Sequence, residues 1–156
     1  MSAMFGDDST LFRMHVSGRR KVVFPWSLSI VDCFFLSNAF KAVAADLSPV
    51  NLIRISDGGN QIERVAIKDA YDLYDVDSDA DGVEVVLLHE ASGSLCYWDV
   101  HERFVVAVGD DVFLSAARPY PADIEKHRYV EAMLHLEGAN TPDSPESIYA
   151  ALTISE

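Results

Sequence analysis

Residues 82–117 constrain the fold more than any other part of the chain. They contain four short apolar runs, at 83–88, 95–98, 104–108 and 112–116, separated by clusters of glycine, serine and aspartate. Short runs of β-branched and aromatic residues with turn-forming residues between them are typical of antiparallel strands. Several runs are apolar on both faces, so we expect this meander to lie at the centre of a domain, with other elements packed against it.

Two further pairs of apolar runs predict β-hairpins in the first half of the chain. The pairs are 10–16 with 21–24, and 52–55 with 62–67. The second pair flanks Asp57-Gly58-Gly59-Asn60, which supplies the positive φ angles that tight hairpin turns require. The first predicted turn is followed by the only basic cluster, Arg19-Arg20-Lys21, which we interpret as a solvated turn too small to bind nucleic acid.

Two longer segments predict helices. Ser29 and Asp32 have the spacing of a capping box, apolar residues follow at helical spacing, and Pro49 closes the segment. This helix is apolar over more than half of its circumference, so we expect it to be the main cover for one face of the meander. A second helix is expected at 122–137, and residues 139–156 are expected to form a linker and a short C-terminal helix.

Together these segments predict an α+β protein consisting of a single globular domain, residues 1–156. We expect a mostly antiparallel sheet of about six to eight strands, built from hairpins and a meander and covered by two helices. Cys33 and Cys96 lie in apolar runs and make no disulfide framework, so both are expected to be buried and reduced. The chain shows neither a signal-peptide pattern nor an uninterrupted apolar span, which favours a cytoplasmic protein that does not enter a membrane.

The second half of the chain is strongly acidic. Residues 1–68 contain eight lysine or arginine residues and six acids, whereas residues 69–156 contain four and nineteen, within a net charge of −13. Seven acids and no base lie in 69–84, which we expect to be mostly loop after one helical turn, because like charges repel. This acidity disfavours nucleic acid and anionic lipid as partners and favours a basic protein.

One motif matches a metal site in only part of its spacing. Asp77, Asp79 and Asp81 alternate as in the opening of a calcium loop, and Gly82 follows them. The twelfth position of such a loop is Leu88 instead of glutamate, and the segment that leads to it has the pattern of a strand. We therefore expect no dedicated metal site and no cofactor, and a calcium-regulated module is the alternative that stays open.

The histidines and cysteines define an alternative interpretation. His89, Cys96 and His101 lie near neighbouring reversals of the meander, where a small enzyme or ligand-binding domain would have a pocket against the first helix. Surface turns explain the two histidines more simply, and a cysteine within a buried run is a poor nucleophile. We therefore expect no catalytic residue and no enzyme activity.

An acidic α+β chain without a catalytic motif resembles bacterial immunity proteins of the contact-dependent growth inhibition or polymorphic-toxin type. The resemblance rests on the acidic segment 69–84, on the meander from Trp98-Asp99 to Gly109-Asp110, and on the missing catalytic set. It implies a cytoplasmic antitoxin that neutralises a cognate toxin domain, often a basic nuclease, by a protein–protein interaction. The sequence makes no prediction of the oligomeric state.

The residues predicted to bind the partner all lie in the acidic segment. Carboxylates attract a basic surface and speed association, and tyrosines serve as aromatic anchors at interfaces. The predicted set is Asp69, Tyr71, Asp72, Tyr74, Asp75, Asp77, Asp79, Asp81 and Glu84. Acids in nearby turns extend this set: Glu90, Glu102, Asp110 and Asp111.

Overall fold

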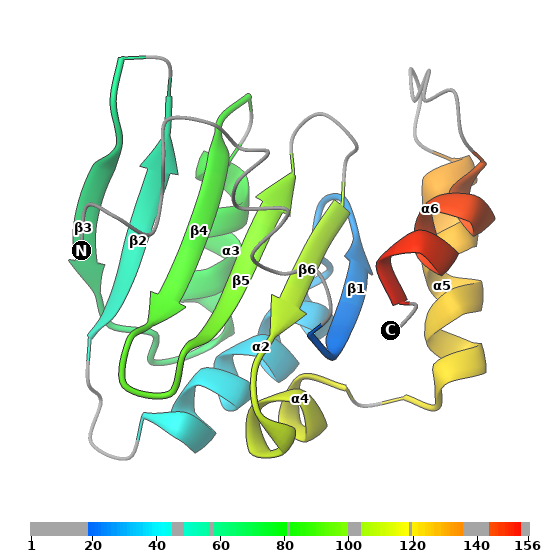
Figure 1. Cartoon of the computed structure of the whole chain (residues 1–156), viewed down its shortest axis with the longest axis horizontal. Helices are drawn as coiled ribbons and strands as arrows, with labels where there is room; N and C mark the ends of the chain where they lie inside the picture. The colour runs from blue at the N-terminus through cyan, green and yellow to red at the C-terminus, as the bar shows by residue number, and fades with distance from the viewer. Residues whose placement is uncertain are drawn as a thin grey trace.

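Antiparallel strands form one open sheet, with the order β1-β6-β5-β4-β2-β3 among the residues that the structure describes (Figure 1). The computed structural model describes residues 19–44, 49–56, 58–80, 82–99, 104–118, 120–135 and 144–153. The strands are β1 (Lys21–Pro25), β2 (Val50–Ile55), β3 (Gln61–Val65), β4 (Glu84–His89), β5 (Ser94–Asp99) and β6 (Phe104–Val108). The helices are α2 (Ile30–Val43), α3 (Ala70–Asp79), α4 (Asp111–Ala117), α5 (Ala122–Leu134) and α6 (Pro145–Thr153). The α+β class and the mostly antiparallel sheet are confirmed, although the described residues form five helices where two were expected to cover the sheet.

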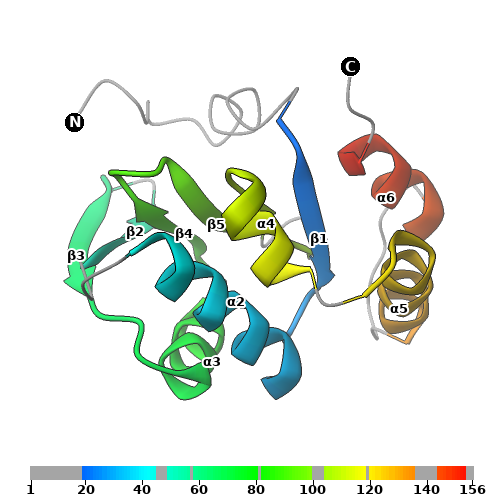
Figure 2. The ribbon, with the colours of Figure 1, turned by 90° about the horizontal axis from the view of Figure 1, so that it is seen from below.

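The meander at the centre of the sheet is buried on both faces. Every residue of β4, β5 and β6 is buried, and Tyr97 pairs with Val86 on one side and Val106 on the other. One face packs against α2, α3 and α4, which lie on the same side of the sheet in Figure 2. The other face shares a core with Tyr129 of α5 and Tyr149 of α6. The three central strands are thus confirmed.

The fourth run of the predicted meander, 112–116, is helical, so the prediction of a strand there was wrong. Asp110 is the N-cap of α4, and its side chain accepts a hydrogen bond from the backbone N–H of Phe113 at 2.8 Å. Such a cap satisfies a donor that the first helical turn leaves free. Phe113 then packs edge-on against Phe40 of α2, with ring centroids 5.1 Å apart. The Phe113 ring also lies close to Gly109. A Cβ at position 109 would be 2.5 Å from that ring, so glycine leaves the room that Phe113 needs.

The acidic segment is also helical, and the prediction of a loop over most of it was wrong. Asp69 caps α3 and accepts hydrogen bonds from the N–H groups of Tyr71 and Asp72 at 2.9 and 3.4 Å. Asp72 in turn accepts from the N–H groups of Lys68 and Asp69 at 2.7 and 3.3 Å. Carboxylates at a helix N-terminus satisfy free donors and interact favourably with the helix dipole. The charge density therefore stabilises this end of the helix instead of disordering it.

Other predicted elements are present with the expected local chemistry. Ser29 and Asp32 form the capping box of α2, which ends at Val43, earlier than expected. β2 and β3 pair as a hairpin next to Gly59, whose φ of 113° is readily adopted only by glycine. β1 is a strand as predicted and pairs with β6. Residues 10–16, the other half of the first predicted hairpin, lie outside the described residues.

The second predicted helix and the C-terminal helix are present as α5 and α6. Tyr129 and Met133 form the buried side of α5. Ile148 and Tyr149 form the buried side of α6, and the rings of Tyr129 and Tyr149 lie 5.4 Å apart. The predicted linker before α6 falls largely on residues 136–143, which lie outside the described residues.

An ion pair joins the end of α4 to the first turns of α5. Arg118 Nε donates a hydrogen bond to Glu125 Oε2 at 3.0 Å, and the Glu125 side chain is only 7% exposed. Burial raises the pKa of Glu125 to about 7, although the nearby charges of Arg118 and Arg128 oppose the rise. The carboxyl group is therefore partly protonated at neutral pH.

We expect Glu125 to make the protein less stable as the pH rises from about 5 to about 8. Its folded pKa lies above the ordinary value of 4.5, so the stabilisation from proton binding is complete below pH 4.5 and is lost as the pH passes through about 7. Over that range the free energy of unfolding of the wild type, relative to Glu125→Gln, should fall by about 2 to 3 kcal/mol. Urea denaturation at both pH values measures this, with Glu146→Gln on α6 as the control at an exposed glutamate. Parallel profiles for wild type and Glu125→Gln would contradict the expectation.

Candidate partner-binding face

Asp77 of α3 is held in contacts within the fold. Its Oδ1 accepts a hydrogen bond from Trp98 Nε1 at 2.9 Å, and its Oδ2 accepts one from the backbone N–H of Leu28 at 3.1 Å. These bonds tie α3 to β5 and to the residue that precedes the N-cap of α2. Burial raises the pKa of Asp77, and the two hydrogen bonds oppose that rise. This carboxylate positions α3 and is not available to a partner.

The structure separates eight of the nine predicted partner-binding residues into an inner set, which caps α3 or contacts the rest of the fold, and an outer, solvent-exposed set. Asp69 and Asp72 form the cap of α3, Asp77 bonds within the fold, and Glu84 is buried on β4. Asp81 lies outside the described residues. The outer set consists of Tyr71, Tyr74, Asp75 and Asp79.

The outer set places two aromatic rings among carboxylates. Tyr71 is 71% exposed and Tyr74 is 47% exposed. Tyr74 precedes Asp77 by about one helical turn, so it lies on the flank of α3 that faces the start of α2. Asp75 and Asp79 are also exposed, and Asp79 lies 3.6 Å from Nη2 of Arg54 on β2. α3 therefore presents an aromatic centre with an acidic margin.

Three exposed apolar residues on the first turns of α2 extend this surface. Ile30, Val31 and Phe34 are 47%, 42% and 53% exposed. Helices α2 and α3 lie side by side (Figure 2). Ile30 and Phe34 are four residues apart and therefore lie on one side of α2. We define the α2–α3 face as these three residues together with the outer set of α3: Ile30, Val31, Phe34, Tyr71, Tyr74, Asp75 and Asp79.

The sequence contained a signal for the α2 part of this face. A helix that is apolar over more than half of its circumference has more apolar surface than one sheet face can cover. The sequence predicts that this helix covers one face of the sheet, and the apolar surface that remains is exposed at Ile30, Val31 and Phe34. Grouped exposed apolar residues of this kind are a mark of interaction surfaces.

The residues of the alternative catalytic site lie in the interior where the structure describes them. His89 is 3% exposed, and its Nδ1 lies 2.8 Å from Ser92 Oγ. Both cysteines are free and buried, as expected, and burial raises the pKa of the Cys96 thiol far above its usual range. A protonated, inaccessible thiol is a poor nucleophile. His101 lies outside the described residues, so the pocket around these three residues stays a prediction.

Neither metal geometry nor comparison with known proteins assigns a function to this chain. Within the described ranges, no group of three or more histidine, cysteine, aspartate or glutamate side chains is placed to hold a metal ion. No helix in the same part of the chain has the length and apolar character needed to span a membrane. Comparisons with protein-family models, with curated proteins and with solved structures find no match. The α2–α3 face therefore has to be interpreted from its own contacts.

Replacing Asp77 by alanine should lower the free energy of unfolding by about 2 to 3 kcal/mol, because the N–H groups of Trp98 and Leu28 lose their acceptor. Urea denaturation followed by tryptophan fluorescence measures the loss. Asp75→Ala is the matched control, since it removes an exposed carboxylate from the same helix, and it should change stability by less than about 0.5 kcal/mol. Equal losses in the two variants would show that Asp77 has no special structural role.

Proposed function

We propose that this protein is a non-catalytic inhibitor that binds and neutralises a basic protein, of the nuclease-like toxin kind, through the α2–α3 face. The observation that carries the proposal is the exposure of Tyr71 and Tyr74 on α3 and of Ile30 and Phe34 on the neighbouring helix α2. Protein interfaces combine an apolar, aromatic centre with a polar rim, and tyrosine is among the residues that contribute most to binding. The proposed role is that of a cytoplasmic antitoxin, and it requires no catalytic residue and no cofactor.

The charge of the chain supports a basic partner. The net charge is −13, and the Asp79 side chain at the margin of the face is 68% exposed. Carboxylates around an apolar centre steer a basic surface towards it and raise the rate of association. A nuclease holds phosphate groups with lysine and arginine side chains, so an acidic inhibitor bound there would cover the groove that receives the substrate.

Dissociation kinetics test the aromatic anchors. A tagged full chain retrieves the partner from its native host at low salt, and biolayer interferometry then gives the rate constants for the purified pair. The double variant Tyr71→Ala/Tyr74→Ala should dissociate at least about tenfold faster, because it removes both anchors. Leu134→Ala on α5 is the matched control, since that side chain is 65% exposed and lies outside the α2–α3 face. If the tyrosine variant dissociates at the wild-type rate, the interface does not depend on Tyr71 and Tyr74.

Association kinetics test the acidic margin in the same assay. The variant Asp75→Asn/Asp79→Asn should associate about threefold to tenfold more slowly and depend less steeply on salt. Asp123→Asn/Glu146→Gln removes the same charge from α5 and α6 and should have a smaller effect. If both variants slow association equally, net charge alone accounts for steering, and the acidic margin has no specific role.

A further inference from the structure

The outer edge of β3 is open to another strand. β3 ends the sheet order β1-β6-β5-β4-β2-β3, so no described strand pairs with its outer edge. Four of its five residues are exposed. It pairs with β2 in unbroken register and contains neither a proline nor a bulge, two features that protect many sheet edges. This edge therefore presents backbone N–H and C=O groups that a further strand could bind.

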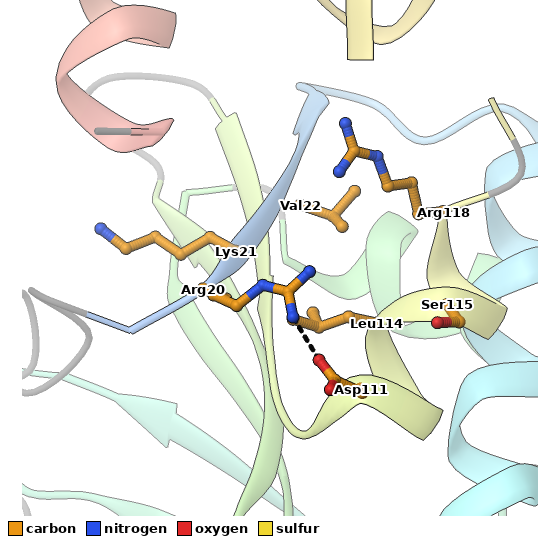
Figure 3. Close-up of a pocket in the computed structure, with 7 residues that line it drawn as sticks. All are labelled: Arg20, Lys21, Val22, Asp111, Leu114, Ser115 and Arg118. Atoms are coloured by element: carbon orange, nitrogen blue, oxygen red, sulfur yellow. Dashed lines mark hydrogen bonds and ion pairs between the residues drawn. The ribbon is translucent and has the colours of Figure 1, made fainter. Parts of the chain in front are cut away.

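The opposite end of the sheet is different. Helices α5 and α6 pack against β1, and Figures 1 and 2 show both of them at the end of the sheet away from β3. Arg20, directly before β1, forms an ion pair with Asp111 of α4 (Figure 3). The described helices therefore cover the β1 end and leave the β3 end exposed.

An apolar row crosses the whole sheet and ends at Ile62 of β3. Each member lies directly opposite the next one on the neighbouring strand. In the order of the strands, the row consists of Val23, Val106, Tyr97, Val86, Ile53 and Ile62. The first five are at most 4% exposed, whereas Ile62 is 57% exposed. The row is therefore buried along its length and stops at an uncovered apolar side chain on the open edge.

Symmetry restricts how two copies of the chain could join at this edge. Two β3 strands that pair antiparallel, edge to edge, are related by a two-fold axis normal to the sheet. Side chains alternate between the faces along a strand, and directly opposite residues lie on the same face. Because the axis keeps each residue on its own face, one residue of β3 has to lie opposite its own copy. That residue defines the register.

The charges of β3 select Ile62 as this central residue. A register centred on Glu63 or Arg64 would place like charges directly opposite each other, which is destabilising. A register centred on either end of β3 would pair most of the strand with residues outside it. With Ile62 at the centre, Gln61 lies opposite Glu63 of the second copy, and Arg64 lies opposite Asn60. Each charged side chain then faces a neutral polar one.

The net charge of the chain opposes self-association less at this edge than over the acidic half. Residues 49–68, which include β2 and β3, contain three lysine or arginine residues and two acids, whereas the whole chain has a net charge of −13. Glu63 also lies 3.3 Å from Nη1 of Arg54 on β2. Two copies that meet at β3 therefore bring together a nearly neutral part of their surfaces.

We propose that the chain forms a symmetric dimer through β3, with the two Ile62 side chains in contact at the two-fold axis. The two sheets join into one, and the apolar row continues from one copy into the other. The contact removes exposed apolar surface from water and gives partners to the outer backbone groups of β3. It uses no residue of the α2–α3 face and stands independently of the proposed inhibitor function.

Sedimentation equilibrium of the full chain tests the dimer. The mean mass should rise with concentration, up to about 1 mM, towards twice the mass of one chain. Ile62→Lys should weaken dimerisation about tenfold or more, because it replaces the apolar pair by two like charges. Val112→Lys is the matched control, since Val112 on α4 is also 57% exposed, and it should dimerise like wild type. Circular dichroism checks that both variants are folded.

Two results of this experiment would overturn the proposal. The mass of a single chain at every wild-type concentration would show that the β3 edge does not bind a second copy, and would leave it for a strand of another protein. Equal weakening by Ile62→Lys and Val112→Lys would show that the association does not depend on β3.

Disulfide cross-linking tests the register. In oxidised glutathione, Ile62→Cys should form a covalent dimer, because directly opposite residues are close enough for a disulfide. Glu63→Cys should not, since its copy is offset by two residues along the strand. Cys33 and Cys96 are buried, and the wild type measures any contribution from them. A dimer from Glu63→Cys alone would overturn the register, and a covalent dimer from neither variant would overturn pairing through β3.

Discussion

The hydrogen bonds of Asp77 determine how the acidic helix lies in this structure. Trp98 on β5 and the backbone of Leu28 both donate to its carboxylate, so one flank of α3 is held against the sheet and the start of α2. Leu73 and Val76 then face the core, and the exposed tyrosines face solvent. Burial disfavours the charged carboxylate and the two donors offset that cost. One partly buried acid thus decides which neighbouring acids of α3 face solvent.

The central meander imposes the second constraint, because all of β4, β5 and β6 is buried. Helices α2, α3 and α4 cover one face, and α5 and α6 contribute to the core on the other (Figures 1 and 2). Helices α2 and α3 therefore carry the acidic and aromatic candidate face on one side of the sheet.

Local pattern was enough to predict β4, β5, β6 and α2, because β-branched runs and the Ser29 capping box act within a few residues. It failed at 112–116, since a short apolar run cannot be assigned to strand or helix from periodicity alone. It failed at 70–79 because aspartates were counted as repelling charges, whereas Asp69 and Asp72 satisfy the free N–H groups of the first turn. In both cases a capping aspartate decided the structure.

The candidate sites depend more on tertiary contacts than the strands do. The acidic segment pointed to Tyr71, Tyr74, Asp75 and Asp79, but Asp77 is hydrogen-bonded to Trp98, 21 residues away, which no local pattern indicates.

The most direct test of the account is a site-specific cross-link from the α2–α3 face in the native host. The photoreactive residue benzoylphenylalanine would replace Tyr74 in one variant and Leu134, exposed on α5, in the other. The account predicts that position 74 gives one product of equal stoichiometry with a basic protein and that position 134 does not. A product from position 134 alone, or an acidic or nucleic-acid partner at position 74, would contradict it.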